Sequence, residues 1–126
     1  MAITRPAFCS VQFIRSLELV YPKHGDFIAF VGNVHSRRFT KSVKKGFITN
    51  STLKAVSLNI SSMVPGVDFS DHRSFWKNGY QAFMGTDTAF YRNPNYHNAG
   101  DLPDTLDYAR AAQVVMGLHR AFSRMP

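Results

Sequence analysis

A chain of 126 residues has the size of one domain, and its 44% hydrophobic and 13% aromatic residues argue against disorder because they suffice for a core. The net charge of +7, from 15 basic and 8 acidic side chains, favours a solvated basic face, with a nucleic-acid or anionic-membrane surface as the alternative. The single cysteine, Cys9, excludes an internal disulfide, and no apolar run reaches the roughly 18 residues of a membrane span.

Strand and helix signals alternate in the first part of the chain. Residues 1–10 are expected to be irregular, and they lack an apolar stretch of signal-peptide length, so the cytoplasm is the default compartment. Residues 11–20 place apolar side chains at alternate positions, which predicts a strand. The apolar run 26–31 predicts a buried strand. Residues 37–47 have helical spacing behind Ser36, a candidate N-cap, and the outer face of this helix is basic.

The middle of the chain continues this alternation. Residues 54–60 predict another strand, and residues 71–78 predict a short helix whose Phe75 and Trp76 face inward. Residues 80–85 predict a further strand.

A long polar loop and a final helix complete the chain. Residues 86–103 have no period and are rich in Asn, Pro, Gly and Asp, and a loop of this length in a compact domain is usually functional or disordered. Asp107 is a candidate cap for a helix that runs to about Ser123. An apolar stripe on this helix is expected to pack onto the sheet, and it consists of Tyr108, Ala111, Val115, Leu118 and Phe122.

Alternating strands and helices predict an α/β fold with a mainly parallel sheet covered on both faces. Sites in such sheets lie beyond the carboxyl ends of the strands. Two segments are expected there: the end of the first strand near Glu18, and the loop that follows residues 80–85.

The histidines form no local metal motif such as His-Glu-x-x-His, and Glu18 is the only glutamate in the chain. His24, in a turn, and His35 and His119, on predicted helices, are interpreted as surface or hydrogen-bonded residues. His72 and His97 belong to an ordered series of motifs in the second half of the chain.

That series resembles the C-terminal part of the co-catalytic zinc aminopeptidase family, which also contains the glutaminyl cyclases. The motifs in residues 65–123 are Ser70-Asp71-His72, Phe75-Trp76, Gly79-Tyr80, Ala82-Phe-Met84, Thr86-Asp87-Thr88-Ala89, Tyr91-Arg92-Asn93-Pro94, Tyr96-His97, Asp101 and Pro103-Asp-Thr-Leu-Asp107. Residues 25–33, followed by Ser36-Arg37, resemble a bacterial branch of the family. The resemblance covers about residues 15–123 and is weak over 48–64.

The resemblance implies a three-layer α/β/α sandwich with a mixed, mainly parallel sheet, whose N-terminal side is missing from this chain. Residues 11–126 would then be the C-terminal half of a zinc peptidase catalytic domain. Family members remove N-terminal residues from peptides with two zinc ions bridged by a carboxylate and a water, and a glutamate acts as general base.

The family's functional roles transfer to a few positions. His97 resembles the last zinc ligand, and Tyr96 the hydroxyl donor to the tetrahedral oxyanion, with simple packing as the alternative role for Tyr96. Glu18 resembles the acidic ligand of the other zinc, although an exposed strand-end carboxylate is nearly as good an interpretation. Asp71 and His72 are expected to orient the metal site from outside the ligand shell, or to cap a helix.

The alternatives for Asp101 stay open, because it can position the His97 loop or cap a turn. In the family the first ligand histidine, the bridging aspartate and the paired glutamates come earlier, and residues 1–10 contain no His, Asp or Glu. Gln81 and Asn98 also depart from the usual proline and threonine. We therefore expect an incomplete zinc site and no peptidase activity from this chain alone.

Three functional hypotheses remain. The first is part of a zinc exopeptidase that acts on peptide substrates. The second is a weak basic binding module that uses the helix at 37–47, without specific nucleic-acid recognition, because the aromatic residues are not interleaved with the basic ones. The third is a non-catalytic remnant whose exposed sheet edge invites self-association. None of the three predicts a membrane partner.

Overall fold

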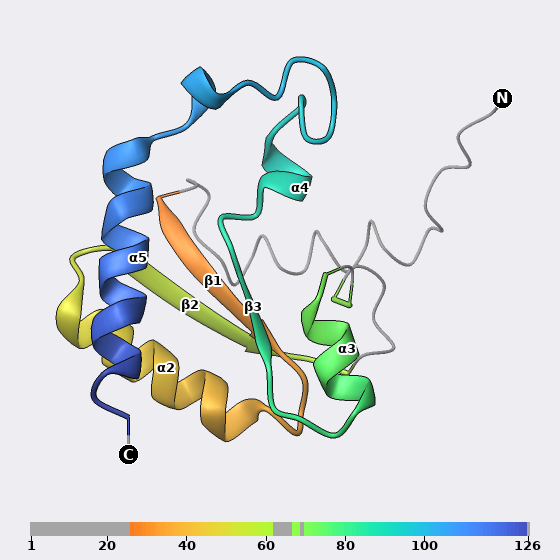
Figure 1. Ribbon diagram of the computed structural model, residues 1–126, viewed down its shortest axis with the longest axis vertical. Helices are drawn as coiled ribbons and strands as arrows, with labels where there is room; N and C mark the ends of the chain where they lie inside the picture. The colour runs from red at the N-terminus through yellow and green to blue at the C-terminus, as the bar shows by residue number, and fades with distance from the viewer. Residues whose placement is uncertain (1–25, 62–66, 69, 126) are drawn as a thin grey trace, which may run out of the picture.

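The computed structural model describes residues 26–61, 67–68 and 70–125. In chain order these residues form β1 (Phe27–Gly32), α2 (Arg37–Asn50), β2 (Lys54–Asn59), α3 (His72–Lys77), β3 (Phe83–Thr86), α4 (Ala89–Arg92), the 3₁₀ helix η1 (Pro103–Thr105) and α5 (Tyr108–Phe122) (Figure 1). The irregular segment expected at 1–10, the strand expected at 11–20 and Glu18 lie outside the described residues.

The described strands form one mixed sheet in the order β2-β1-β3. β1 and β2 are parallel, with Phe27 opposite Lys54, and α2 provides the crossover that a parallel pair requires. β3 runs antiparallel to β1, with Ala29 opposite Thr86. The α/β class is therefore confirmed. The antiparallel β3 makes the described sheet mixed, as expected.

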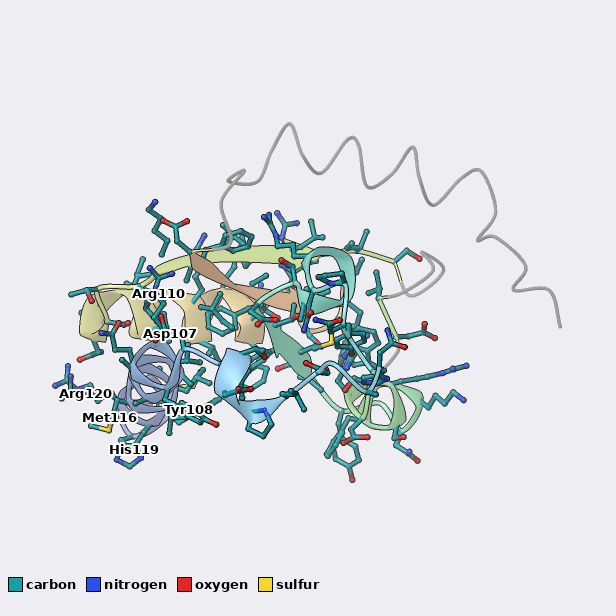
Figure 2. All side chains as sticks on the ribbon, turned by 90° about the horizontal axis from the view of Figure 1, so that it is seen from above. Asp107, Tyr108, Arg110, Met116, His119 and Arg120 are labelled. Carbon is teal, nitrogen blue, oxygen red and sulfur yellow. The ribbon has the colours of Figure 1, made fainter. Side chains whose placement is uncertain are left out.

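The core lies between the sheet and two helices on one of its faces. α2 and α5 both lie on this face (Figure 2). Ile28 and Phe30 of β1 contact Phe47 of α2, and the partly buried Val114 and Leu118 of α5 pack against them. The Phe30 and Phe47 rings meet edge to face, with centroids 5.4 Å apart. This cluster holds both helices against the strands.

The residues through which α5 packs against the rest of the fold are smaller than those of its predicted apolar stripe. Val115 is 65% exposed and Tyr108 61% exposed, so the predicted packing of these two side chains on the sheet is wrong. Ala111 is also exposed, whereas Phe122 is partly exposed but stacks on Phe83. The inward-facing positions follow helical spacing: Gly117 and Ala121 are buried, and Val114 and Leu118 are partly buried.

Small residues allow α2 and α5 to approach each other closely. A Cβ atom at Gly117 would lie 2.5 Å from the Phe47 ring, and one at Gly46 of α2 would lie 3.0 Å from the Ala121 Cβ. A larger side chain at either glycine would separate α2 from α5. The glycines therefore set the position of α5.

α3 and the start of β3 are joined by polar contacts. Trp76 is half-buried and its Nε1 donates to the Ala82 carbonyl, whereas Phe75 is 55% exposed, which corrects its predicted inward orientation. Gly79, with a φ of 78°, ends α3 in the left-handed conformation that favours glycine. Ser36 is at the N-cap position of α2, but its hydroxyl accepts from the Ala82 N–H instead of capping the helix.

None of the described helices combines the length and the apolar composition that crossing a membrane would need.

We predict that Gly117→Val lowers the free energy of unfolding by about 1–3 kcal/mol, because the added side chain overpacks the Phe47 contact. The matched control is Ala112→Val, on the exposed side of the same helix, which should cost only about 0.5 kcal/mol through helix propensity. Urea unfolding monitored by circular dichroism measures both. Equal losses in the two variants would contradict the close helix packing.

Candidate functional site

The Tyr96–His97 loop leaves the sheet at the edge where the parallel strands begin. It follows Thr86, the last residue of β3, and Thr86 is opposite Ala29 near the start of β1. Figure 1 shows α4 and the following loop at this end of the sheet. The loop thus lies beyond the carboxyl end of β3 but beside the amino ends of β1 and β2. The loop follows the carboxyl end of its own strand, as expected, and its expected neighbour, the end of the strand that carries Glu18, lies outside the described residues.

Short-range hydrogen bonds shape the start of the loop. The Asp87 carboxylate accepts from the Ala89 N–H at 2.9 Å, and the Thr88 N–H donates to the Thr86 hydroxyl at 2.9 Å. Arg92 donates from Nε to the Thr88 hydroxyl, and its guanidinium lies 5.5 Å from the centre of the Phe27 ring. These contacts fix α4 against the first residue of β1.

The turn that contains His97 is held by Asp101. One carboxylate oxygen of Asp101 accepts from the His97 N–H at 3.3 Å, and the other accepts from Asn93 Nδ2 at 3.0 Å. Asn93 also accepts, through its side-chain oxygen, from the Asn95 N–H at 2.9 Å. The Asp101 carboxylate therefore positions this loop, which is one of the two roles expected for it.

His97 itself has a φ of 58°, in the left-handed region that few non-glycine residues adopt. Such a conformation costs about 1 kcal/mol or more and persists where the surroundings fix it. The Tyr96 ring stacks on the His97 ring, with centroids 4.1 Å apart and planes at 13°. Tyr96 is half-buried and His97 is exposed, so the turn presents the imidazole to solvent.

Asp71 and His72 lie at the other end of β3, before its first residue. His72 is buried and its Nε2 is 2.6 Å from the Val67 carbonyl oxygen. Its ring meets Trp76 edge to face at 4.4 Å. Asp71 is the exposed N-cap of α3, and its side chain makes no capping hydrogen bond. No described hydrogen bond or ion pair joins either residue to the His97 loop.

The described residues do not by themselves fit a zinc site. Within residues 26–61, 67–68 and 70–125, no three His, Cys, Asp or Glu side chains gather in a geometry suited to a metal ion. His97 offers one imidazole, and both oxygens of its neighbour Asp101 already accept hydrogen bonds. The second expected ligand, Glu18, lies outside the described residues. Stable zinc sites use three or four protein ligands, so a complete site needs further donors.

The sequence did not predict a groove beside β3. This open groove of about 490 Å³ lies between α3, the β3 strand and the aromatic side chains Phe39 and Phe122. Its lining is mostly apolar, with Asp71 as the one acidic side chain. Phe39 and Phe122 belong to helices that are distant in the sequence, so no local motif could predict the groove.

Comparison with known proteins finds a longer relative. The chain is 43% identical over 103 residues to the uncharacterized protein YfbL of Escherichia coli (strain K12), and these residues are 82% of this chain and 32% of the relative. The chain thus spans about a third of the length of this curated relative. No family model matches the chain. No solved structure matches it. The similarity to YfbL gives no activity, because that protein is itself described only as uncharacterized.

We predict that Asp101→Ala speeds hydrogen exchange of the His97 amide by roughly fivefold, because it removes a hydrogen bond worth about 1 kcal/mol. Global stability should change little, since the loop is exposed. The matched control is Asp104→Ala, an exposed aspartate of η1. Nuclear magnetic resonance exchange rates measure the effect. An unchanged His97 rate in Asp101→Ala would contradict the positioning role.

Proposed function

We propose that this chain contributes part of the site of a zinc-dependent exopeptidase of the aminopeptidase type, which removes N-terminal residues from peptides. In this proposal His97 is one zinc ligand, and Tyr96 donates its hydroxyl to the oxyanion of the reacting carbonyl. Glu18 is proposed as a further ligand, and the remaining ligands and the general base come from another polypeptide. The single observation that carries the proposal is the geometry of the Tyr96–His97 turn.

That turn has the properties expected of a preorganised ligand. The His97 backbone is strained, and Asp101 and Asn93 fix it through side-chain hydrogen bonds. Strain at an exposed, well-anchored residue is more common at functional sites than in ordinary surface loops. The exposed imidazole is free of the packing that buries His72. These features support a ligand role for His97 and leave His72 with a structural contact to Val67.

The location of the turn also supports a site shared with the preceding segment. The turn lies at the end of the sheet where β1 begins, and Glu18 precedes Phe27 by nine positions in the sequence. We propose Glu18, which lies outside the described residues, as a second ligand on the resemblance of its segment. Asp71 and His72, which lie at the other end of β3, remain proposed supporting residues through the resemblance alone.

A three-layer α/β/α sandwich belongs to the same proposal. α2 and α5 cover the face of β1 that carries Ile28 and Phe30. Phe27 and Ala29 alternate with these residues and are also buried, at 5% and 4% exposure. Burial on both sides of β1 supports a sheet with cover on both faces.

Zinc-dependent peptide hydrolysis requires more carboxylate side chains than this chain has available as ligands and base. Peptide hydrolysis at zinc needs several ligands and a base, and the chain contains one glutamate and seven aspartates. Asp101 and Asp107 are engaged in hydrogen bonds of the loop and of the α5 cap. Asp26 and Asp68 form ion pairs with Lys54 and Arg73. The proposal therefore assigns activity to an assembly that holds the missing donors.

We predict no zinc-dependent turnover of aminoacyl chromogenic substrates by the purified chain alone. Turnover should appear when the chain is combined with a recombinant fragment carrying the part of YfbL outside the matched region, because that fragment can supply the missing ligands and base. His97→Ala should lower this rate by at least about a hundredfold, as for the loss of a group that the transition state needs.

The matched control is His35→Ala, which removes an exposed histidine in the turn before α2 and should leave the rate unchanged. Intact YfbL serves as the positive reference. Unchanged activity in His97→Ala would overturn the ligand assignment. Inactivity of both the combination and intact YfbL would overturn the peptidase proposal.

A weak polyanion-binding function is the second candidate, and the exposed basic side chains of α2 favour it. These are Arg37, Arg38, Lys41 and Lys45, and none of them forms an ion pair with a described residue. They follow one solvated face, and no base-reading motif accompanies them.

We predict that duplex DNA binds the chain weakly and without sequence preference, and that binding disappears as salt rises from about 50 to about 200 mM. Fluorescence anisotropy with two unrelated duplexes measures this, and Lys41→Glu with Lys45→Glu should abolish the residual binding. Salt-resistant binding that discriminates between the duplexes would favour the binding-module hypothesis over the exopeptidase.

A further inference from the structure

The apolar stripe of α5 is only partly covered by the rest of the described structure. Val114 and Leu118 pack against the core. Three further apolar side chains of the helix remain exposed, and they are Tyr108, Val115 and Phe122. They are spaced seven residues apart, so they form one row along the helix. A row of this kind is the usual contact surface of two helices that run side by side.

The exposed row faces the groove beside β3. Phe122 lines this groove and stacks on Phe83 of β3, whereas Ala121, its neighbour in the helix, contacts α2. Figure 2 shows Tyr108 on the side of α5 that faces α3, and Arg120 on the opposite side. α5, β3 and α3 follow one another across the same face of the sheet (Figures 1 and 2). The row and the groove therefore form one continuous face between α5 and α3.

The rest of this face is also mainly apolar. Phe83 forms part of its wall, and the exposed Phe75 of α3 lies on its far side. The charged side chains nearby have both signs, because Asp71 lines the groove and Asp107 pairs with Arg110 at the start of α5. The recognition of an occupant therefore depends on apolar contact more than on charge.

A helix is the occupant that fits between two helices on one face of a sheet. Packed helices lie about 8–10 Å apart, so a helix placed beside α5 would contact the exposed row, β3 and α3 together. An extended segment suits this place less well, because a strand pairs through its backbone with the edge of a sheet and does not lie across its face.

The sequence of this chain predicts no further helix that could fill the groove. Its three predicted helices correspond to α2, α3 and α5, all of which are described. Among the remaining residues, 1–10 are expected to be irregular and 11–20 to form a strand. Residues 21–25 and 62–66 are each too few for more than about one helical turn. The helix is therefore expected from another polypeptide.

We propose that the exposed row of α5 and the groove beside β3 bind an amphipathic α-helix of another polypeptide, which carries apolar side chains at heptad spacing and runs alongside α5. The longer relative has about two thirds of its sequence outside the matched region, and that region is the assigned source of the helix. A second copy of this chain is disfavoured, because each copy has a net charge of +7. The inference goes beyond the proposed peptidase function, since it concerns association and does not depend on zinc or on His97.

The test is coexpression of the full chain with a tagged fragment of YfbL that comprises the sequence outside the matched region. The complex is isolated through the tag and measured by gel filtration, without added zinc or substrate. We expect a one-to-one complex. Val115→Lys places a charge at the centre of the row and should lower the recovery of the chain by at least about tenfold. The matched control Gln113→Lys adds the same charge at an exposed position on the nearly opposite side of α5, and it should leave the recovery unchanged.

Urea unfolding of the purified chain alone separates an outside partner from cover by the chain itself. Because Val115 is exposed, both lysine variants should keep the unfolding midpoint of the unmodified chain. A midpoint lowered by Val115→Lys but not by Gln113→Lys would overturn the proposal in favour of residues 1–25 as the cover of this face.

The remaining outcomes are equally decisive. Failure of the unmodified chain to copurify with the fragment, or equal recovery of the two variants, would overturn the proposal. Self-association of the chain alone in sedimentation, abolished by Val115→Lys, would overturn it in favour of a second copy. A complex that forms but hydrolyses no peptide would support this interface and count against the peptidase proposal.

Discussion

The contact among Phe30, Phe47 and Gly117 is the constraint on which the described structure depends. Phe30 and Phe47 are fully buried, and their edge-to-face contact joins the central strand to α2. Gly117 lets α5 approach the same ring, which a side chain at that position would prevent. Because β3 pairs with β1 and α5 packs on α2, this one cluster fixes both ends of the loop between β3 and α5. The exposed loop thus depends on the most buried residues.

Inside that loop, polar side chains replace the packing that an exposed segment lacks. Asp107 accepts from the Arg110 N–H at the start of α5, and the Tyr108 hydroxyl donates to the Pro103 carbonyl. Asp101 and Asn93 then set the His97 turn. Asn and Asp suit this role because their short side chains bond neighbouring backbone groups and tolerate unusual conformations. The result is a histidine that is both exposed and well defined, and this combination distinguishes His97 from the buried His72.

β3 organises both proposals although it has only four residues. Its end leads into the His97 loop, and its start forms the wall of the groove with α3. A four-residue strand has few partners of its own, so the polar ties from Ser36 and Trp76 to Ala82 help to hold it in place. The two proposals remain independent, because one concerns an imidazole beyond the strand and the other concerns apolar contact in the groove beside the strand.

Local signals in the sequence determined which segments form which elements. The apolar run that became β1, the Asp107 cap and the Gly79 stop depend on neighbouring residues, so the sequence sufficed to predict them. The Tyr96–His97 turn was found through resemblance, and its strain was not predictable, because it depends on the Asp101 side chain closing the turn. The direction of β3, the groove and the burial of Gly117 in place of Val115 were decided only in the tertiary structure. A strand has the same residue pattern in either direction, and a helix buries the face that lets it approach most closely, so both are set by contacts between residues distant in the chain.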